Sequence, residues 1–392
     1  MIPGNNLYDY DDSVSLTTSA KRQQSTTTST TGTTLISLPS DLIVEILFTL
    51  PVKSLLLLKC ACKSLNHQIC DPKFAKNHLR LSTRCHHLIV SSKTDSGELL
   101  FLDTAFPSLF STSRVTQKRL RYPISLQNEH CLKVCSCDGI LCITPTSFGK
   151  FSSVLWNPSI GKSKVLSPLE YDWKKFKTPI YSFGYDHFIH NYILVAVLFF
   201  NDEDEKNNEV SVHTLGTDHW RRIHDFPFSG PIQGSGIFVC GTVNWLAFDA
   251  SNFSLPTIVS LDLEEESFQI LPKPDLERNW SNLGLLRDCL CIFNISGMFL
   301  DVWIMKQHGY KESWTKLYSV PFMEVPHFFV YRPFTKAFYI SGDEQLLMDF
   351  NGCKELKFTV CNSKTSTLNI REIRNISWFM FPEVYLESLI SP

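Results

Sequence analysis

Residues 35–81 carry apolar side chains at helical spacing. Five of them fall at i, i+1, i+4, i+5 and i+8, on one face of a helix: Leu42, Ile43, Ile46, Leu47 and Leu50. Ser40 is suited to cap the first turn of this helix, and Pro51 is expected to end it and to open the next. Asp71 and Pro72 mark the start of a fourth short helix. The segment is therefore predicted to form a module of three to four helices.

The second of these helices carries more apolar surface than its own module can cover. Leu55–Leu58 are four consecutive leucines, so the helix is apolar nearly all round. A module of about 45 residues is too small to bury every face of such a helix. Some of this surface is therefore predicted to meet another protein or the domain that follows.

From about His86 onward the pattern changes to short apolar stretches separated by Gly, Pro, Asn and Asp, which is typical of β-strands. A weak repeat runs through this region. Its units are marked by Val154, Val212, Val259, Val302 and Val360, at intervals of 58, 47, 43 and 58 residues. First hairpins precede four of these markers, at 134–143, 236–248, 283–293 and 337–350. Roughly 50 residues for a four-stranded unit is the spacing of a kelch-type propeller blade.

The predicted fold is mainly β with a small α module, and the β part is a propeller of about six kelch-like blades. His87–Asp103 would belong to one more unit beyond the five marked ones. A β-sandwich or an irregular β domain is the alternative for the same strands. The chain of 392 residues would then have three parts: a disordered Ser/Thr-rich tail at 1–34, the helical module at 35–81 and the propeller at 86–392.

Charge and composition narrow the class of protein. The formal net charge is −2 and no dense cluster of Lys and Arg stands out, so no nucleic-acid partner is expected. The longest strongly apolar run, Tyr192–Phe200, has nine residues, about half of what a membrane helix needs, so no membrane partner is expected. No secretory signal is visible at the N-terminus. The 13 cysteines are therefore expected to be reduced thiols of a cytoplasmic or nuclear protein.

Motifs for catalysis or cofactor binding do not stand out. Three Cys-x-Cys pairs lack the spacing and the second pair of a zinc site, and they are interpreted as packed core thiols: Cys60 and Cys62, Cys135 and Cys137, Cys289 and Cys291. His86 and His87 are interpreted as surface or packed histidines. In Trp156–Pro158 the Trp is predicted to fill the space between blades while Asn-Pro makes a turn. No catalytic residue, metal or cofactor is predicted.

The helical segment closely resembles an F-box. The resemblance rests on Leu38–Leu55, where Leu-Pro, an Ile-Leu step and Leu-Pro-Val-Lys stand in register, and on Lys59–Ser64. Leu65 departs from the family, which usually has an aromatic residue there. That substitution keeps an apolar side chain but loses volume, so it bears on packing more than on partner binding.

The rest of the chain resembles the F-box-associated interaction domain of the large plant F-box group. Its motifs appear in the expected order: Gly139–Cys142, Leu155–Lys162, Phe183–Asp186, Leu215–Arg221, Gly241–Leu246 and Val302–Met305. Together the two resemblances imply a non-catalytic receptor that joins an unknown protein substrate to a Skp-type adaptor, and through it to the cullin scaffold of a ubiquitin ligase. They also imply an adaptor-binding face made of Leu38, Pro39, Leu42, Ile46, Leu50, Pro51 and Leu55.

Two other functions stay open from the sequence. One is a kelch-like propeller that binds a glycan or a small ligand without a ligase role, which clustered exposed aromatic residues on one rim would favour. The other is an enzyme with redox metal chemistry, which would need His, Tyr and Cys ligands that converge.

Overall fold

The computed structural model describes most of the chain after residue 37. The described residues are 38–392 apart from 83–84, 95–97, 112–114, 116, 127–131, 146–151, 201–207, 250–251, 277–280, 298, 322–336, 353–354, 363–367 and 374–381. The predicted tail at 1–34 lies outside them. The chain divides into two compact units, 1–43 and 44–392, and the boundary falls inside the first helix. The second unit therefore holds most of the helical module together with the β domain.

Four helices form where the apolar spacing predicts them. They are α1 (Ser40–Thr49), α2 (Val52–Leu58), α3 (Lys63–Cys70) and α4 (Pro72–Leu81). Pro51 stands in extended conformation just before α2, as its fixed φ and missing N–H require. The Asp71 carboxylate caps α4 by accepting a hydrogen bond from the backbone N of Lys73 at 2.8 Å, and Pro72 follows in the first turn.

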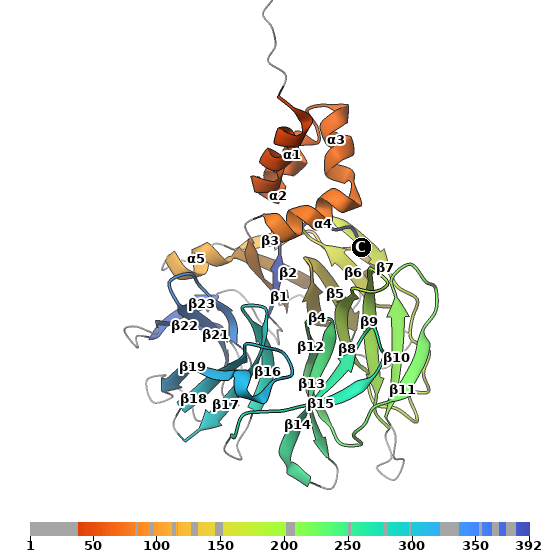
Figure 1. The fold of residues 1–392 in the computed structure, drawn as a ribbon, viewed down its shortest axis with the longest axis vertical. Coiled ribbons are helices and arrows are strands. Elements are labelled where there is room, and N and C mark those ends of the chain that lie inside the picture. The colour runs from red at the N-terminus through yellow and green to blue at the C-terminus, as the bar shows by residue number, and fades with distance from the viewer. Residues whose placement is uncertain are drawn as a thin grey trace, which may run out of the picture. The chain divides into compact units, whose positions relative to one another are not determined.

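The β domain is a six-bladed propeller (Figure 1). Each blade is an antiparallel four-stranded sheet, and in five blades the strands follow one another along the chain. The first two of these blades are β4 (Leu132–Cys137), β5 (Ile140–Pro145), β6 (Val154–Asn157) and β7 (Lys162–Val165), and then β8 (Ile180–Asp186), β9 (Asn191–Leu198), β10 (Glu209–Thr214) and β11 (Arg221–Asp225). The next two are β12 (Ile232–Val239), β13 (Thr242–Asp249), β14 (Asn252–Asp262) and β15 (Phe268–Leu271), and then β16 (Ser281–Leu286), β17 (Cys289–Ser296), β18 (Phe299–Met305) and β19 (Trp314–Pro321). The last is β20 (Ala337–Ile340), β21 (Gln345–Gly352), β22 (Glu355–Asn362) and β23 (Leu368–Ile373).

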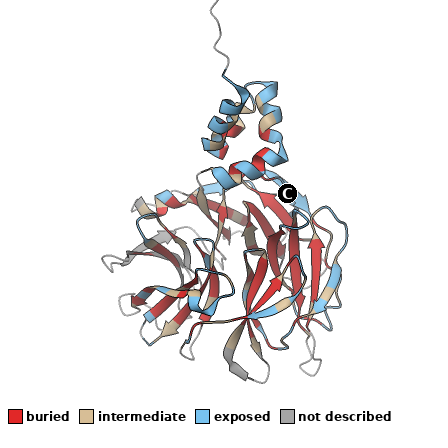
Figure 2. Ribbon diagram, in the orientation of Figure 1, coloured by how far each residue is buried: buried red, intermediate tan, exposed pale blue. Residues whose placement is uncertain are grey.

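The strand pattern confirms the predicted repeat. The five marker valines lie on β6, β10, β14, β18 and β22, the third strand of each of these blades. The third strands β6, β10 and β18 each hold at least three consecutive buried residues, so both faces of these strands are covered. Figure 2 shows buried positions along the strands of the propeller.

The remaining blade is assembled from both ends of the propeller sequence. β1 (His86–Lys93), β2 (Leu99–Ala105) and β3 (Lys118–Leu120) supply three strands, and β24 (Pro382–Leu386) pairs with β1 to complete the sheet. The sequence had placed His87–Asp103 in one more unit, but it had not revealed the partner strand. A short helix, α5 (Phe106–Ser111), follows β2.

Antiparallel connections give the propeller two distinct ends. We call one the hairpin end, because it carries the turns from the first to the second strand of each blade, at 138–139, 187–190, 240–241, 287–288 and 341–344. We call the other the linker end, because the segments from one blade to the next lie there, including 121–131, 166–179, 226–231 and 272–280. β1 follows α4 and starts at the hairpin end, so the chain enters the propeller there.

Polar side chains stabilise the blade formed by β24, β1, β2 and β3, which we call the composite blade. The Tyr385 hydroxyl on β24 donates to Oδ1 of Asp103 on β2 at 2.9 Å. The same oxygen accepts from Nδ1 of His87 on β1 at 2.8 Å, and Nε2 of His87 lies 3.4 Å from the Glu387 carboxylate. Asp103 and Tyr385 are buried, so these bonds form where water competes little. Three strands from opposite ends of the chain are thereby held together.

The segment after β24 is fastened to the next blade by Asn157. Its amide nitrogen donates to the carbonyl oxygens of Ser388, at 3.1 Å, and Ile390, at 2.7 Å, while its oxygen accepts from the backbone N of Ser159. Asn157 is fully buried. A side chain at Gly139 would overlap the carbonyl oxygen of Leu386, so this segment also needs a glycine in the adjacent hairpin.

The predicted role of Trp156 is confirmed. It is buried in one cluster with Phe101 of β2, and the two rings pack edge to face with their centroids 5.5 Å apart. A similar contact joins two other blades, where Ser182 Oγ accepts from the backbone N of Gly236 at 2.9 Å and from the indole N–H of Trp245 at 3.1 Å. Aromatic side chains and close backbone contacts thus fill the spaces between blades.

We expect Asn157→Ala to destabilise the fold by about 2–4 kcal/mol, because two donated hydrogen bonds and one accepted one are lost, and buried carbonyl oxygens lose their donor. Urea denaturation measures this change. Ser163→Ala, an exposed change on the neighbouring β7, serves as control and should stay within about 0.5 kcal/mol. Equal effects of the two changes would contradict the proposed fastening.

His87 should make the stability depend on pH. Burial lowers the pKa of its imidazole, but the hydrogen bond and charge of Asp103 and the charge of Glu387 outweigh burial and raise it above its ordinary value. A pKa that is higher in the folded state adds stability below the unfolded value of about 6.5, and this contribution is lost as pH rises through the folded pKa.

We therefore expect the Tm of the wild-type chain to fall between about pH 6 and pH 8 relative to that of His87→Gln. Gln keeps a hydrogen-bonding group but does not titrate in this range. Thermal melts of both proteins across the pH series provide the measurement, and parallel curves would rule out His87 as the source.

Candidate protein-docking surface

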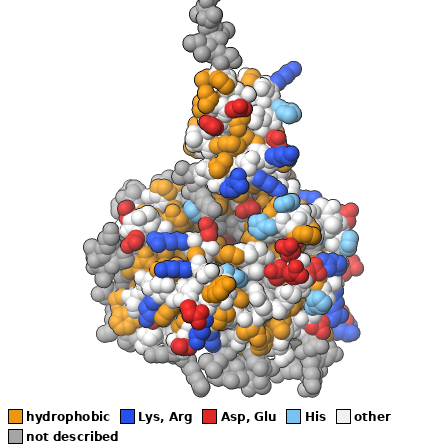
Figure 3. All heavy atoms as spheres, in the orientation of Figure 1, with side chains coloured by type: hydrophobic (Ala, Val, Ile, Leu, Met, Phe, Trp, Pro, Cys, Tyr) orange, Lys and Arg blue, Asp and Glu red, His pale blue; other side chains and the backbone are white. Residues whose placement is uncertain are grey.

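Helix α1 presents large apolar side chains to solvent. Leu42 and Ile46 are 45% and 50% exposed, and their i, i+4 spacing places them on successive turns of one helix face. Ile43 is also exposed. Figure 3 shows hydrophobic side chains on the surface of the helical module. Several large apolar groups on one short helix are the usual mark of a protein-binding surface.

The inward side of the module is buried. Leu47, Val52, Leu55 and Ile69 are buried in one cluster with Phe74. The Phe74 ring also stacks on that of Phe48, with centroids 4.9 Å apart. This packing fixes α2, α3, α4 and the end of α1 against one another.

A buried histidine joins the end of α1 to α4. Nε2 of His78 donates to the carbonyl oxygen of Leu50 at 2.8 Å, which satisfies one of the carbonyls left open at a helix C-terminus. The sequence analysis did not single out His78. The signal that could have pointed to His78 is a polar residue on the inner face of a helix.

The structure separates the seven residues predicted to bind an adaptor. Five of them, Leu38, Pro39, Leu42, Ile46 and Pro51, are exposed, and Leu50 is half-buried. Leu55 differs, because it is fully buried inside the module. Adaptor contact stays a prediction for the set, but the chain described here keeps Leu55 in its core.

The run of four leucines resolves into separate roles. Leu55 faces inward, Leu56 and Leu58 are partly buried against the same core, and Leu57 is 70% exposed. Leu65, which replaces the aromatic residue usual in the resemblance, also packs partly buried against this core.

Helix α4 meets the propeller. Phe74 and Ala75 of α4 share one buried cluster with Leu389 and Ile390 and with residues of β5, β8 and β9. A polar contact adds to it: Nζ of Lys76 donates to the hydroxyl of Tyr185 on β8 at 2.8 Å and lies 5.1 Å from the centre of its ring. The expectation that another protein or the following domain covers part of the leucine-rich α2 stays a prediction, because these contacts come from α4.

The cysteine pairs divide between core and surface. Cys137, Cys142 and Cys291 are buried, and burial raises the pKa of the first two thiols, which keeps them protonated. The interpretation of Cys60 and Cys62 as core thiols is wrong, because both are exposed in the turn between α2 and α3. There the Cys62 sulfur accepts the backbone N–H of Leu65 at 3.4 Å as a helix cap.

A metal-binding cluster and a membrane-spanning helix are both absent from the described residues. The described His, Cys, Asp and Glu residues form no group of three or more that could hold a metal ion. In the same part of the chain, no helix is long and apolar enough to cross a membrane.

Comparison with known proteins finds two family domains that follow one another along the chain. Residues 35–77 match the family described as F-box domain, and residues 93–392 match the F-box associated beta propeller domain. An Arabidopsis thaliana F-box/kelch-repeat protein is 29% identical over 370 residues, covering 91% of this chain and 96% of its own. The F-box protein CPR1 of the same plant is 27% identical, covering 86% and 85%.

Solved structures add only a distant likeness. A chain of the nidogen/laminin complex is 14% identical with a TM-score of 0.45, covering 77% of this chain and 99% of that one. A likeness of this size bears on neither fold nor function.

The two neighbouring leucines Leu55 and Leu57 provide a matched test of the module's core. We expect Leu55→Ala to cost about 2–5 kcal/mol of unfolding free energy, because it empties a fully buried position. Leu57→Ala should stay within about 0.5 kcal/mol, because Leu57 is exposed. Chemical denaturation of the full chain measures both, and a larger loss at Leu57 would mean that α2 is rotated from the described orientation.

Proposed function

The chain belongs to the F-box proteins that carry an F-box associated beta propeller domain, and we propose that it is a substrate receptor of a Skp-cullin-F-box ubiquitin ligase. Proteins with this pair of domains are generally such receptors, and an F-box implies binding to a Skp-type adaptor. The observation that carries the proposal is the exposed apolar face of α1, with Leu42 and Ile46 at its centre.

The receptor acts by proximity rather than by bond chemistry. Its helices dock on the adaptor, which is bound to the cullin scaffold, while the propeller holds a protein substrate. A substrate held in this way meets the ubiquitin-loaded enzyme at a high effective concentration, so the rate of transfer rises without a catalytic group in the receptor. We place this activity in the cytoplasm or the nucleus.

The two ends of the propeller have different tasks in this proposal. α4 and the Lys76–Tyr185 contact lie at the hairpin end, where the chain also enters the first blade. The linker end is free for a substrate, and its segments vary in length and composition without disturbing the blades. We therefore assign substrate recognition to the linker end.

A glycan-binding role has less support. Such a role would be favoured by exposed aromatic residues that gather on one rim. Among the described residues, the large exposed aromatic side chains come from separate segments: Trp173, Phe188, Phe299 and Tyr310. Trp173 lies in a linker, whereas Phe188 lies in a turn at the hairpin end.

A double variant of α1 tests the receptor proposal. We expect wild-type chain to capture a purified Skp-type adaptor, and Leu42→Asp with Ile46→Asp to abolish capture, because two charges would enter an apolar interface. A pull-down with quantified adaptor gives the measurement. Circular dichroism confirms that the variant remains folded, as expected for two exposed positions.

Ile270→Asp is the matched control. Ile270 is exposed to a similar or greater extent, but it lies on β15 of the propeller. This variant should capture the adaptor as well as wild type does. If wild-type chain captures no Skp-type adaptor, the receptor proposal is abandoned, and if the control also loses capture, the α1 face is not the specific contact.

A further inference from the structure

The linker between β7 and β8 has a positive charge that the chain as a whole lacks. Within 166–179 the sequence holds Lys174, Lys175 and Lys177 against Glu170 and Asp172, a net charge of +1, whereas the whole chain carries −2. All three lysines are exposed and stand within four consecutive positions. The net charge of the full chain does not reveal this local group of lysines.

Residues 172–177, which we call the Trp173 loop, have an ordered backbone. The Asp172 carboxylate accepts a hydrogen bond from the backbone N of Lys174 at 3.0 Å. The carbonyl oxygen of Asp172 accepts from the backbone N of Phe176, also at 3.0 Å. The loop is therefore a closed turn, whose shape its own hydrogen bonds maintain.

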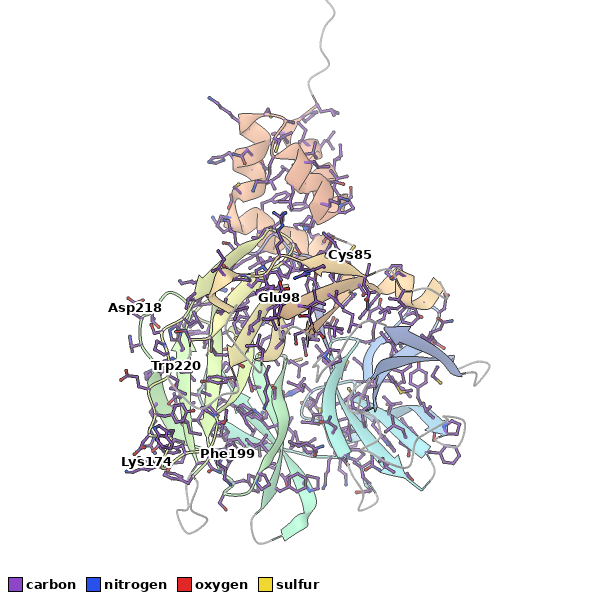
Figure 4. The ribbon with its side chains drawn as sticks, turned by 180° about the vertical axis from the view of Figure 1, so that it is seen from behind. Cys85, Glu98, Lys174, Phe199, Asp218 and Trp220 are labelled. Atoms are coloured by element: carbon purple, nitrogen blue, oxygen red, sulfur yellow. The ribbon has the colours of Figure 1, made fainter. Side chains whose placement is uncertain are left out.

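The turn is fastened to the end of β9. Phe176 is buried, and its ring lies 4.4 Å from that of Phe200, centre to centre. The backbone N of Lys177 donates to the carbonyl oxygen of Phe199 at 2.7 Å. Figure 4 shows Lys174 and Phe199 at the end of the propeller away from α4. The loop thus stands at the linker end on a rigid support.

The fastened turn presents an aromatic side chain among cations. Trp173 is 57% exposed, and Nζ of Lys174 lies 5.8 Å from the centre of its ring. Lys175 and Lys177 are exposed beside it. Trp is the residue type that most often dominates binding energy at interfaces, and a preordered backbone lowers the entropy that binding costs. The lysines add an attraction for anionic groups.

We propose that the Trp173 loop captures an acidic segment of the substrate protein. An apolar side chain of that segment packs on Trp173, and its anionic groups lie near Lys174, Lys175 and Lys177. The inference rests on the proposed receptor function, because it names the chemistry of the substrate that the propeller holds.

A short acidic peptide fits this surface better than a nucleic acid does. The lysines of the loop occupy only the four positions from Lys174 to Lys177. A long polyanion would extend past the lysines and be repelled by the negative remainder of the chain. A short segment makes its contacts within the positive region.

Selection from a peptide library tests the proposal. The full chain is incubated with a library of short random peptides, and the composition of the retained peptides is read by sequencing. We expect acidic peptides with one large apolar residue to be enriched. Trp173→Ala should weaken binding of an enriched peptide about tenfold in fluorescence anisotropy. Lys174→Glu with Lys175→Glu should turn the preference toward basic peptides.

The matched control is Tyr310→Ala with Lys306→Glu. These residues form another pair of exposed aromatic and lysine side chains, on the segment between β18 and β19 at the hairpin end. This variant should retain the wild-type preference and affinity. All the substituted positions are exposed, and a thermal melt of each variant checks that the fold is kept.

Several results would overturn the inference: no enrichment, enrichment of neutral or basic peptides by wild type, or unchanged binding by the Trp173 variant. Tighter binding of a labelled single-stranded oligonucleotide through the same lysines would assign the loop to nucleic acid instead. Adaptor capture is measured in the same preparations. If the adaptor is captured without acidic enrichment, this inference alone fails; if acidic peptides bind without adaptor capture, the receptor function alone fails.

Discussion

The pairing of β24 with β1 is the constraint on which the rest of the structure depends. A propeller has no covalent ring, so the six sheets close only if one of them contains strands from both ends of the β sequence. Here one strand from the C-terminal side joins three from the N-terminal side. The hydrogen bonds of Asp103 with Tyr385 and His87, and those of Asn157 with the segment after β24, reinforce that pairing.

Closure also supports α4. The segment that follows β24 contributes Leu389 and Ile390 to the same buried cluster as Phe74 of α4. The residues that seal the ring are therefore among those that support this helix. In the proposed receptor function such support matters, because loss of orientation between adaptor and substrate lowers the effective concentration that a receptor creates.

The sequence predicted those features that local patterns encode. Helix periodicity located the four helices, and the third strand of five blades appeared as an apolar run at each marker valine. The pairing of β24 was not predicted, because its partner β1 lies nearly 300 residues earlier and pairing over such a distance leaves no local sequence pattern. Pattern alone predicted the six-bladed architecture, but not which blade is composite.

The candidate site was predicted less completely, for a physical reason. Leu55–Leu58 are identical in chemistry, so only helix orientation separates buried Leu55 from exposed Leu57. Exposed Cys60 and Cys62 were misplaced because a thiol in a turn has the same hydrophobicity as one in a core. The three lysines of the Trp173 loop were missed because the total charge of the chain, −2, does not reveal a local group of this size.

The composite blade has a consequence for the order of events during synthesis. The ribosome makes β1 well before β24, so the growing chain carries β1 with one edge unpaired until β24 has been made. Unpaired strand edges are templates for aggregation, and domains tend to fold as units as they emerge. Every copy of this protein therefore passes through an open-ringed stage, and a chain that terminated before Pro382 would keep the docking helices while its ring stayed open.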